Sequence, residues 1–149
     1  MLTFKAMINF RRIILTCLFL FIVSILWSQN SSQNWVKISD DEIAAIYYDS
    51  KTMITDEWGN HIIWVITDLH ALEWQNYYTS EIGSRTPVVQ TKTKAMYDSD
   101  YNYVMVRQVQ LYNKSGSLLF DTGDDTSAGW GFVNASDPVG LVGEYLSKN

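Results

Sequence analysis

Cysteine is almost missing from this chain, which has a single one, Cys17, among its 149 residues. Cys17 lies inside an N-terminal apolar run and not at its end, where a lipoprotein signal carries its cysteine. If that run is removed during export, the rest of the chain has no disulfide, no thiolate nucleophile and no cysteine ligand for a metal. The fold then depends on its hydrophobic core.

Histidine is equally scarce, and the common catalytic motifs are missing. The only two, His61 and His70, flank one predicted strand. The strand would hold them about 30 Å apart, which excludes a shared metal ion. The sequence also has no serine elbow, phosphate loop or dinucleotide fingerprint. We therefore expect no catalytic residue, no cofactor and no metal site, and a protein that is not an enzyme.

One motif suggestive of catalysis is present at residues 118–123, where apolar residues precede Asp121-Thr122-Gly123. It resembles the active-site turn of aspartic proteases, but that chemistry needs two carboxylates that share a proton. The chain has one such triplet, and 26 residues follow it. We interpret it as a strand that ends in a turn. Asp121, Asp124 and Asp125 lack the ligand alternation of a helix-loop-helix calcium site, so we interpret them as a solvated acidic loop.

Basic residues are outnumbered by acidic ones, 11 to 16. Three of the basic residues, and none of the acidic ones, precede residue 29, which leaves a net charge of −8 on residues 29–149. A surface this acidic repels phosphate backbones. We therefore expect no binding to nucleic acid.

The longest apolar run is N-terminal. It extends from Ile13 to Val23 with Thr16 as its only polar residue, and it resumes briefly before Ser28. Three basic residues precede it, and its roughly 15 residues are fewer than the roughly 20 of a bilayer span. This pattern predicts a signal peptide at residues 1–28, a flexible tail at 29–34 and one domain at 35–149. The alternative is an uncleaved anchor.

That interpretation implies export to the periplasm, the outer-membrane surface or the medium. It also implies that no stable membrane span remains once the signal is cleaved.

Residues 88–121 have the clearest pattern, an alternation of polar and apolar residues broken at 98–100 and 113–116. This is typical of two or three consecutive antiparallel strands. Residues 35–38, 42–48 and 52–55 predict shorter strands, although the alanines of 42–48 also suit a helical turn. Residues 61–69 are apolar on both faces and predict a central strand covered on both sides, with Trp64 in the core.

Two further segments complete the domain. Residues 71–85 have no clear period and predict a long loop or an irregular edge element. Residues 136–147 predict a helix that Ser136 or Asp137 caps, with Pro138 in its first turn. Its glycines, Gly140 and Gly143, would permit close approach to the sheet. Because the helix is short, we expect it to dock only marginally and to detach alone when its apolar stripe is disrupted.

Aromatic side chains are abundant, with six tryptophans and nine tyrosines. Four of them lie in a predicted turn or in the polar stretch 71–85: Trp58, Trp74, Tyr77 and Tyr78. Amphipathic rings on exposed segments are typical of binding surfaces, so these four are candidate partner-binding residues. The alternative is that they anchor loops onto the sheet.

Read in order, the segments of the chain resemble the surface-adhesin protein E family of small exported bacterial proteins. The matching pieces are Trp35-Val-Lys-Ile38, Tyr47-Tyr-Asp49 with Thr52-Met-Ile54, Ile63-Trp-Val-Ile-Thr-Asp68, Lys94 to Asp98, Val106-Arg107, Tyr112-Asn-Lys-Ser-Gly116, Trp130 and the helix at 136–146. Family members often tie the helix to the sheet with two cysteines; this chain has Ser99 and Leu146-Ser147 at those places. The resemblance implies an antiparallel sheet with a C-terminal helix, an adhesive role and no catalytic residues.

Together these patterns predict an α+β domain, a twisted antiparallel sheet of about six strands with a C-terminal helix packed on it. The expected function is that of a non-enzymatic exported binding module, with adhesion to host or surface proteins implied by the resemblance. The alternative is a periplasmic carrier or sensor of a small apolar ligand held between sheet and helix. The patterns assign neither the ligand nor the oligomeric state.

Overall fold

The computed structural model describes residues 34–149, so the predicted signal peptide and most of the predicted tail lie outside the described residues. In chain order the elements are β1 (Trp35–Asp40), β2 (Ala44–Asp49), β3 (Ile54–Thr55), β4 (His61–Leu69), α2 (Leu72–Glu81), β5 (Gln90–Tyr97), β6 (Tyr103–Tyr112), β7 (Leu118–Asp121), β8 (Gly131–Phe132) and α3 (Pro138–Ser147). No helix in this part of the chain is long and apolar enough to cross a membrane.

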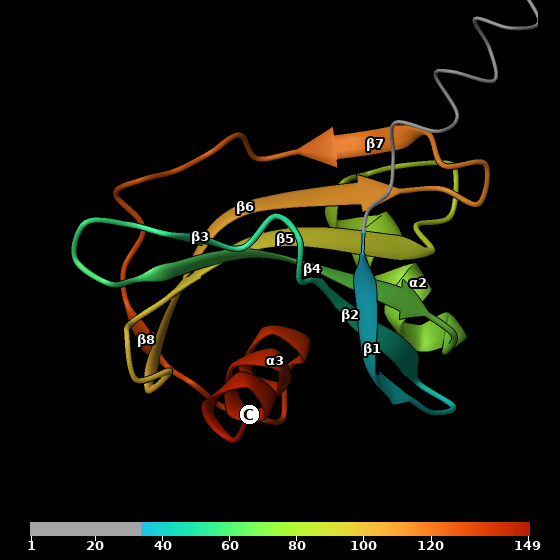
Figure 1. Cartoon of the computed structure of the whole chain (residues 1–149). Coiled ribbons are helices and arrows are strands. Elements are labelled where there is room, and N and C mark those ends of the chain that lie inside the picture. Colours follow the sequence, from blue (N-terminus) through green and yellow to red (C-terminus); the bar gives the residue numbers. More distant parts are fainter. Residues whose placement is uncertain (1–33) are drawn as a thin grey trace, which may run out of the picture. The chain divides into compact units, whose positions relative to one another are not determined.

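All the strands belong to one antiparallel sheet. Six of them follow the order β1-β2-β4-β5-β6-β7, and the two-residue strands β3 and β8 pair with β4 and β6. The prediction of an antiparallel sheet is therefore confirmed, and the two short strands bring its count from about six to eight. Figure 1 shows the sheet curving around α3, with β1 and β2 to one side of the helix and β8 to the other.

The alternation predicted for residues 88–121 becomes β5, β6 and β7. Along β5, the odd-numbered residues from Thr91 to Tyr97 are buried and the intervening ones are half-buried. The turn between β6 and β7 is held by the Asn113 side chain, which accepts hydrogen bonds from the N–H groups of Ser115 and Ser117. Gly116 has a φ of +76°, a conformation that costs glycine little. Local side-chain chemistry therefore fixes this hairpin.

β4 lies in the middle of the sheet, as predicted, between β2 and β5. Its odd-numbered residues are buried from Ile63 onward, but Trp64 and the residues on the same face are only half-buried. The expectation that both faces are covered is therefore wrong. Among the described residues no helix lies on the second face; Trp64 is instead covered by Lys92, whose Nζ lies 4.7 Å from the ring centroid.

α3 begins and packs as the sequence predicts. Oδ1 of Asp137 accepts a 2.7 Å hydrogen bond from the N–H of Gly140, and Pro138 is in the first turn. Val142 is fully buried in the main core cluster with Ile46, Ile63, Val65, Ala95 and Tyr97. A Cβ on Gly143 would lie 2.8 Å from Cε1 of Tyr97, so the missing side chain is what lets the helix approach the sheet.

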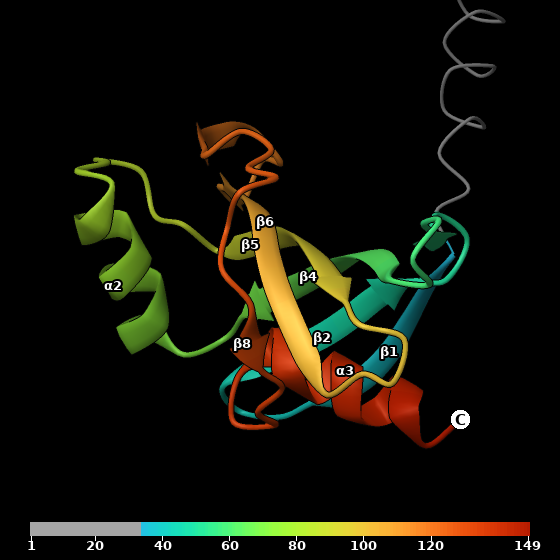
Figure 2. The same ribbon diagram turned by 90° about the vertical axis from the view of Figure 1, so that its left-hand side faces the viewer.

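α2 replaces the loop predicted for residues 71–85, and that prediction is wrong. None of its residues is buried, which explains why no apolar period marks it in the sequence. Its side chains instead make hydrogen bonds to residues just before and just after the helix in the chain. Nε2 of Gln75 donates to the carbonyl of Leu69, and Oγ1 of Thr79 accepts a hydrogen bond from the N–H of Val88. Figure 2 shows α2 standing to one side of the sheet.

Candidate binding site at helix α2

The α2 helix gathers three of the four candidate aromatic residues. The ring centroids of Trp74 and Tyr77 are 5.8 Å apart, those of Tyr77 and Tyr78 are 5.3 Å apart, and those of Trp74 and Tyr78 are 6.4 Å apart. Trp74 is 45% exposed and Tyr77 is 50% exposed. Tyr78 is half-buried and packs on a second core cluster of Leu69, Val88 and Leu111. The two interpretations of these residues, exposed rings and anchors onto the sheet, apply to different members of the group. Tyr78 anchors the helix, whereas Trp74 and Tyr77 face solvent.

Trp58 is the fourth candidate, and the structure separates it from the other three. It lies in the turn between β3 and β4 and is 76% exposed. The nine residues of β4, a length of about 30 Å, lie between this turn and the start of α2. Trp58 therefore cannot share a small site with the α2 aromatics.

A cleft of about 380 Å³ opens beside α2. Two of the candidates, Trp74 and Tyr78, form part of its lining. The other lining residues come from the end of β1, the β1–β2 turn, the strands β2, β4 and β5, and the start of α3: Ser39, Asp41, Ile43, Ala44, Ile46, Thr67, Leu69, Thr91, Ala135, Ser136, Asp137, Pro138 and Leu141. The walls are mostly apolar, and they bring together segments that are far apart in the sequence.

Two threonines give the sheet side of the cleft its polar groups. Thr67 of β4 and Thr91 of β5 are directly paired across the two strands. They are 3% and 6% exposed, and both line the cleft. Within residues 34–149, neither hydroxyl has a protein hydrogen-bond partner. The sheet therefore offers the cleft two neighbouring groups that can each donate and accept a hydrogen bond.

The lining of the cleft contains two carboxylates and no lysine or arginine. Oδ1 of Asp41 accepts hydrogen bonds from the N–H groups of Ala44 and Ile43, at 2.9 and 2.8 Å. These bonds hold the pKa of Asp41 below its usual range, so it stays charged at neutral pH. Asp137 caps α3. The cleft therefore favours groups that are neutral or positively charged.

Some of these residues could not be assigned to a site from the sequence. Ile43 is 53% exposed and borders the cleft, and Leu141 reaches it from α3. The alternation of β5 does indicate that Thr91 shares a face with Thr93 and Ala95. No sequence signal brings that face to α2.

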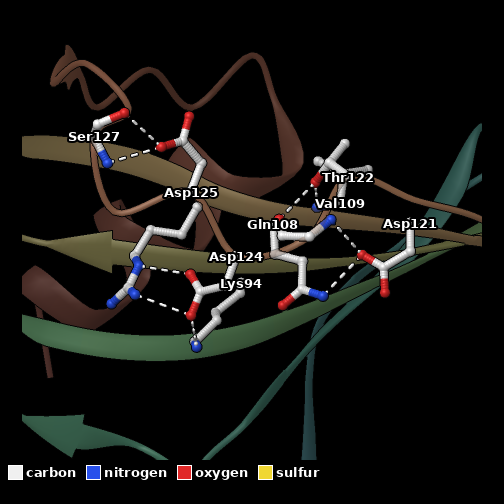
Figure 3. Close-up of polar contacts among 10 residues, drawn as sticks. Lys94, Gln108, Val109, Asp121, Thr122, Asp124, Asp125 and Ser127 are labelled. Atoms are coloured by element: carbon white, nitrogen blue, oxygen red, sulfur yellow. Dashed lines mark hydrogen bonds and ion pairs between the residues drawn. The ribbon is translucent and has the colours of Figure 1, made fainter.

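The carboxylates of the acidic loop after β7 are each bound to neighbouring groups (Figure 3). Asp121 accepts from the amide groups of Gln108 and Gln110 and from the N–H of Gly123. These bonds lower the pKa of Asp121. Asp121 also ends β7, which confirms the interpretation of the Asp-Thr-Gly triplet as the end of a strand.

Asp124 pairs with two cations from the sheet. Nζ of Lys94 lies 2.6 Å from Oδ2 of Asp124, and Nε of Arg107 lies 2.9 Å from Oδ1. Lys94, followed by Arg107, holds the pKa of Asp124 below its usual range. Asp125 instead accepts from the N–H and hydroxyl of Ser127. Within residues 34–149 no cluster of three or more histidine, cysteine or acidic side chains is arranged to hold a metal ion.

The two histidines lie at opposite ends of β4, as predicted. His61 begins the strand and stacks on Tyr101, with 4.9 Å between ring centroids and 7° between planes. His70 follows its last residue, and Nδ1 of His70 lies 2.8 Å from the carbonyl oxygen of Asp41. Neither histidine is within the cleft lining.

Comparison of the chain with protein-family models and with curated proteins found no match.

Proposed function

We propose that this protein is a non-enzymatic exported binding module that holds a protein ligand at α2 and the adjoining cleft. The observation that supports the proposal is that α2 exposes apolar and aromatic side chains to solvent. A surface helix normally buries its apolar residues against the core. α2 instead leaves Leu72 72%, Tyr77 50% and Trp74 45% exposed. Tryptophan and tyrosine are the residues that most often dominate binding energy in protein interfaces.

The surroundings of α2 extend this apolar surface. Ile43, 53% exposed, is joined to the start of the helix because its carbonyl accepts hydrogen bonds from the N–H groups of His70 and Ala71. The helix itself is fixed at both ends, through Gln75 to β4 and through Thr79 to the segment before β5. A rigid apolar patch loses little conformational entropy on binding. The resemblance to the protein E family supports adhesion as the role of this surface.

A second function, the carrier or sensor of a small apolar ligand, is favoured by the cleft alone. Its volume of about 380 Å³ falls within the range of roughly 300–1,000 Å³ that is usual for small-molecule sites. The ligand would lie between the sheet and the two helices.

The test of the protein-binding role is surface plasmon resonance of the purified protein on immobilised host extracellular-matrix proteins. Trp74→Ala and Tyr77→Ala should each weaken binding by about tenfold or more, because exposed aromatic anchors carry much of an interface. Trp130→Ala is the matched control, because Trp130 is 44% exposed and Trp74 is 45% exposed. Trp130 precedes β8, which pairs with the start of β6, whereas the α2 residues pack near the other end of β6. Equal losses in all three variants would contradict a site at α2.

The neutral apolar dye N-phenyl-1-naphthylamine tests the carrier role. Strong dye fluorescence that Trp74→Ala reduces, together with no binding to any immobilised protein, would favour the small ligand. Protease treatment of intact cells adds the location: digestion supports a surface adhesin, and protection supports a periplasmic carrier.

A further inference from the structure

The chemistry of the cleft indicates which kind of group it binds. We infer that the cleft receives a tyrosine side chain of the protein ligand, flanked in the ligand by lysine or arginine. This inference rests on the proposed function, because it names the part of the partner that α2 and the cleft hold.

The walls require an apolar body. Trp74 and Tyr78 close the cleft on the helix side, and Leu69 and Leu141 contribute aliphatic surface from β4 and α3. An aromatic side chain buries about 150–250 Å² in such a place. Its ring can also meet Trp74 or Tyr78 in the tilted arrangement that these two rings already make with one another.

The sheet side of the cleft requires a polar tip on that body. The hydroxyls of Thr67 and Thr91 are neighbours across the β4–β5 ladder and have no other protein partner within residues 34–149. A phenol both donates and accepts a hydrogen bond, so one phenol can bind both threonines. Phenylalanine and the aliphatic residues would leave these hydroxyls without a partner and remove their water, which costs free energy.

The charge of the lining selects the residues beside the tyrosine. Asp41 and Asp137 are the only charged side chains of the lining. The carboxylate of Asp41 accepts a hydrogen bond from the N–H of Ile43, and that of Asp137 accepts one from the N–H of Gly140. Glu42, next to Asp41 in the sequence, is exposed, whereas Asp40 on the other side of Asp41 is paired with Lys37. Lysine or arginine beside the tyrosine would gain attraction to this side of the cleft, and acidic residues would be repelled.

The occupant is a segment of a protein because of what adjoins the cleft. Leu72 and Tyr77 of α2 are exposed and are not part of the lining, so they extend the apolar surface beyond the cleft. A free small molecule would leave that surface uncovered, whereas the chain on either side of a tyrosine would cover it.

Three capped peptides test the inference against the purified protein by isothermal titration calorimetry: Gly-Lys-Tyr-Lys-Gly, the same peptide with phenylalanine for tyrosine, and the same with glutamate for both lysines. We expect the phenylalanine peptide to bind about threefold to tenfold more weakly, the effect of one net hydrogen bond. The glutamate peptide should show no measurable binding. Equal affinity of the tyrosine and phenylalanine peptides, or of the lysine and glutamate peptides, would overturn the inference.

Two kinds of variant test which side chains of the protein cause these preferences. Thr67→Val and Thr91→Val keep the shape of the side chain and should remove the preference for tyrosine over phenylalanine. Asp137→Ser keeps an N-cap for α3 but removes the charge, and should reduce the preference for lysine over glutamate. Circular dichroism melting of each variant confirms that it folds. Preferences that survive these changes would place the peptide elsewhere on the molecule and contradict the inference.

The outcomes also separate this inference from the proposed function. If binding to matrix proteins depends on Trp74 but the peptides show no preference, the site at α2 stands and the tyrosine inference fails. If Trp74→Ala has no effect on matrix binding, the proposed function fails, whatever the peptides do.

Discussion

Tyr97 connects α3 to the sheet through one hydrogen bond and one close contact. Its side chain is fully buried, and its hydroxyl donates a 2.7 Å hydrogen bond to the carbonyl of Val139. The edge of its ring faces Gly143. Each of these residues therefore constrains the others, and single substitutions here test the packing of the whole helix.

Gly143→Ala should destabilise the protein, although the same change in an exposed helix stabilises by about 1 kcal/mol. The new Cβ would lie 2.8 Å from Cε1 of Tyr97, and overpacking of this kind costs about 1–3 kcal/mol. Urea unfolding measures the difference. Gly129→Ala is the control, because its Cβ would meet nothing within 4 Å. A gain in stability for Gly143→Ala would show that α3 lies farther from the sheet.

Tyr97 should also make the stability fall at alkaline pH. Burial raises the pKa of Tyr97 above its ordinary value of 10.0. Since the folded state holds the proton more tightly, stability is unaffected below about pH 10 and falls above it, by up to about 1.4 kcal/mol per pH unit. In Tyr97→Phe this slope should decrease, while stability at pH 7 drops by about 1 kcal/mol with the lost hydrogen bond. Urea unfolding at pH 8 to 11 measures both effects; an unchanged slope would contradict the assignment.

Among the elements, α2 and α3 differ in how they are held. α3 inserts Val142 into the main core, so it shares that core with three central strands. α2 buries none of its residues fully and is held by Tyr78, Ile82 and side-chain hydrogen bonds. The helix that the sequence predicts is therefore a core element, and the helix it does not predict presents the proposed binding surface.

Val142→Asp should unfold the whole domain in one cooperative step. From the sequence, the short helix is expected to detach alone, but Val142 is 0% exposed and packs among Ile63, Val65 and Tyr97. An unpaired carboxylate there costs about 4 kcal/mol or more, a large part of the roughly 5–15 kcal/mol that stabilises a domain. Thermal melting followed by circular dichroism and hydrogen exchange measures this loss. Ser147→Asp, on an exposed position of α3, should change little.

Fast exchange confined to α3, with full protection of β6, would instead show that the helix is a separate unit.

For the molecule as a whole, the net charge bears on the partners that it can bind. Its excess of acidic residues disfavours nucleic acid as a partner, and it matches the acidic lining of the cleft. Two lysines on the face of the sheet that carries Trp64 already have partners. Lys92 lies over the rings of Trp64 and Trp35, and Lys94 forms an ion pair with Asp124. Neither lysine lines the cleft of the proposed binding site.

The secreted form should begin at Gln29, with its N-terminal glutamine either free or cyclised. This follows from the predicted signal peptide, which ends at Ser28. Intact-mass spectrometry of protein from the culture medium or the periplasm checks it. Recovery of only the full-length chain, in the membrane fraction, would favour the uncleaved anchor.

The sequence by itself determined the strands β1 to β7 and the capped C-terminal helix, but not the two-residue strand β8. These features depend on local patterns: period-two alternation in β5, the side chain of Asn113 in its turn, and Asp137 before Pro138 at the start of α3. Each needs only neighbouring residues, so each can be recognised without the fold.

Only the tertiary structure decided that residues 72–81 form a helix, that one face of β4 lacks a helix among the described residues, and that a cleft joins Trp74 to Thr67. No apolar period in the sequence reveals α2, because the helix is not held by a stripe of buried apolar side chains. Its side chains instead make ring contacts with one another and hydrogen bonds to residues just before and after the helix. The type of the aromatic residues and their polar surroundings in the sequence mark them as candidates. Whether they meet depends on the path of β4, which brings Trp74, Tyr77 and Tyr78 to one end of the strand and leaves Trp58 at the other.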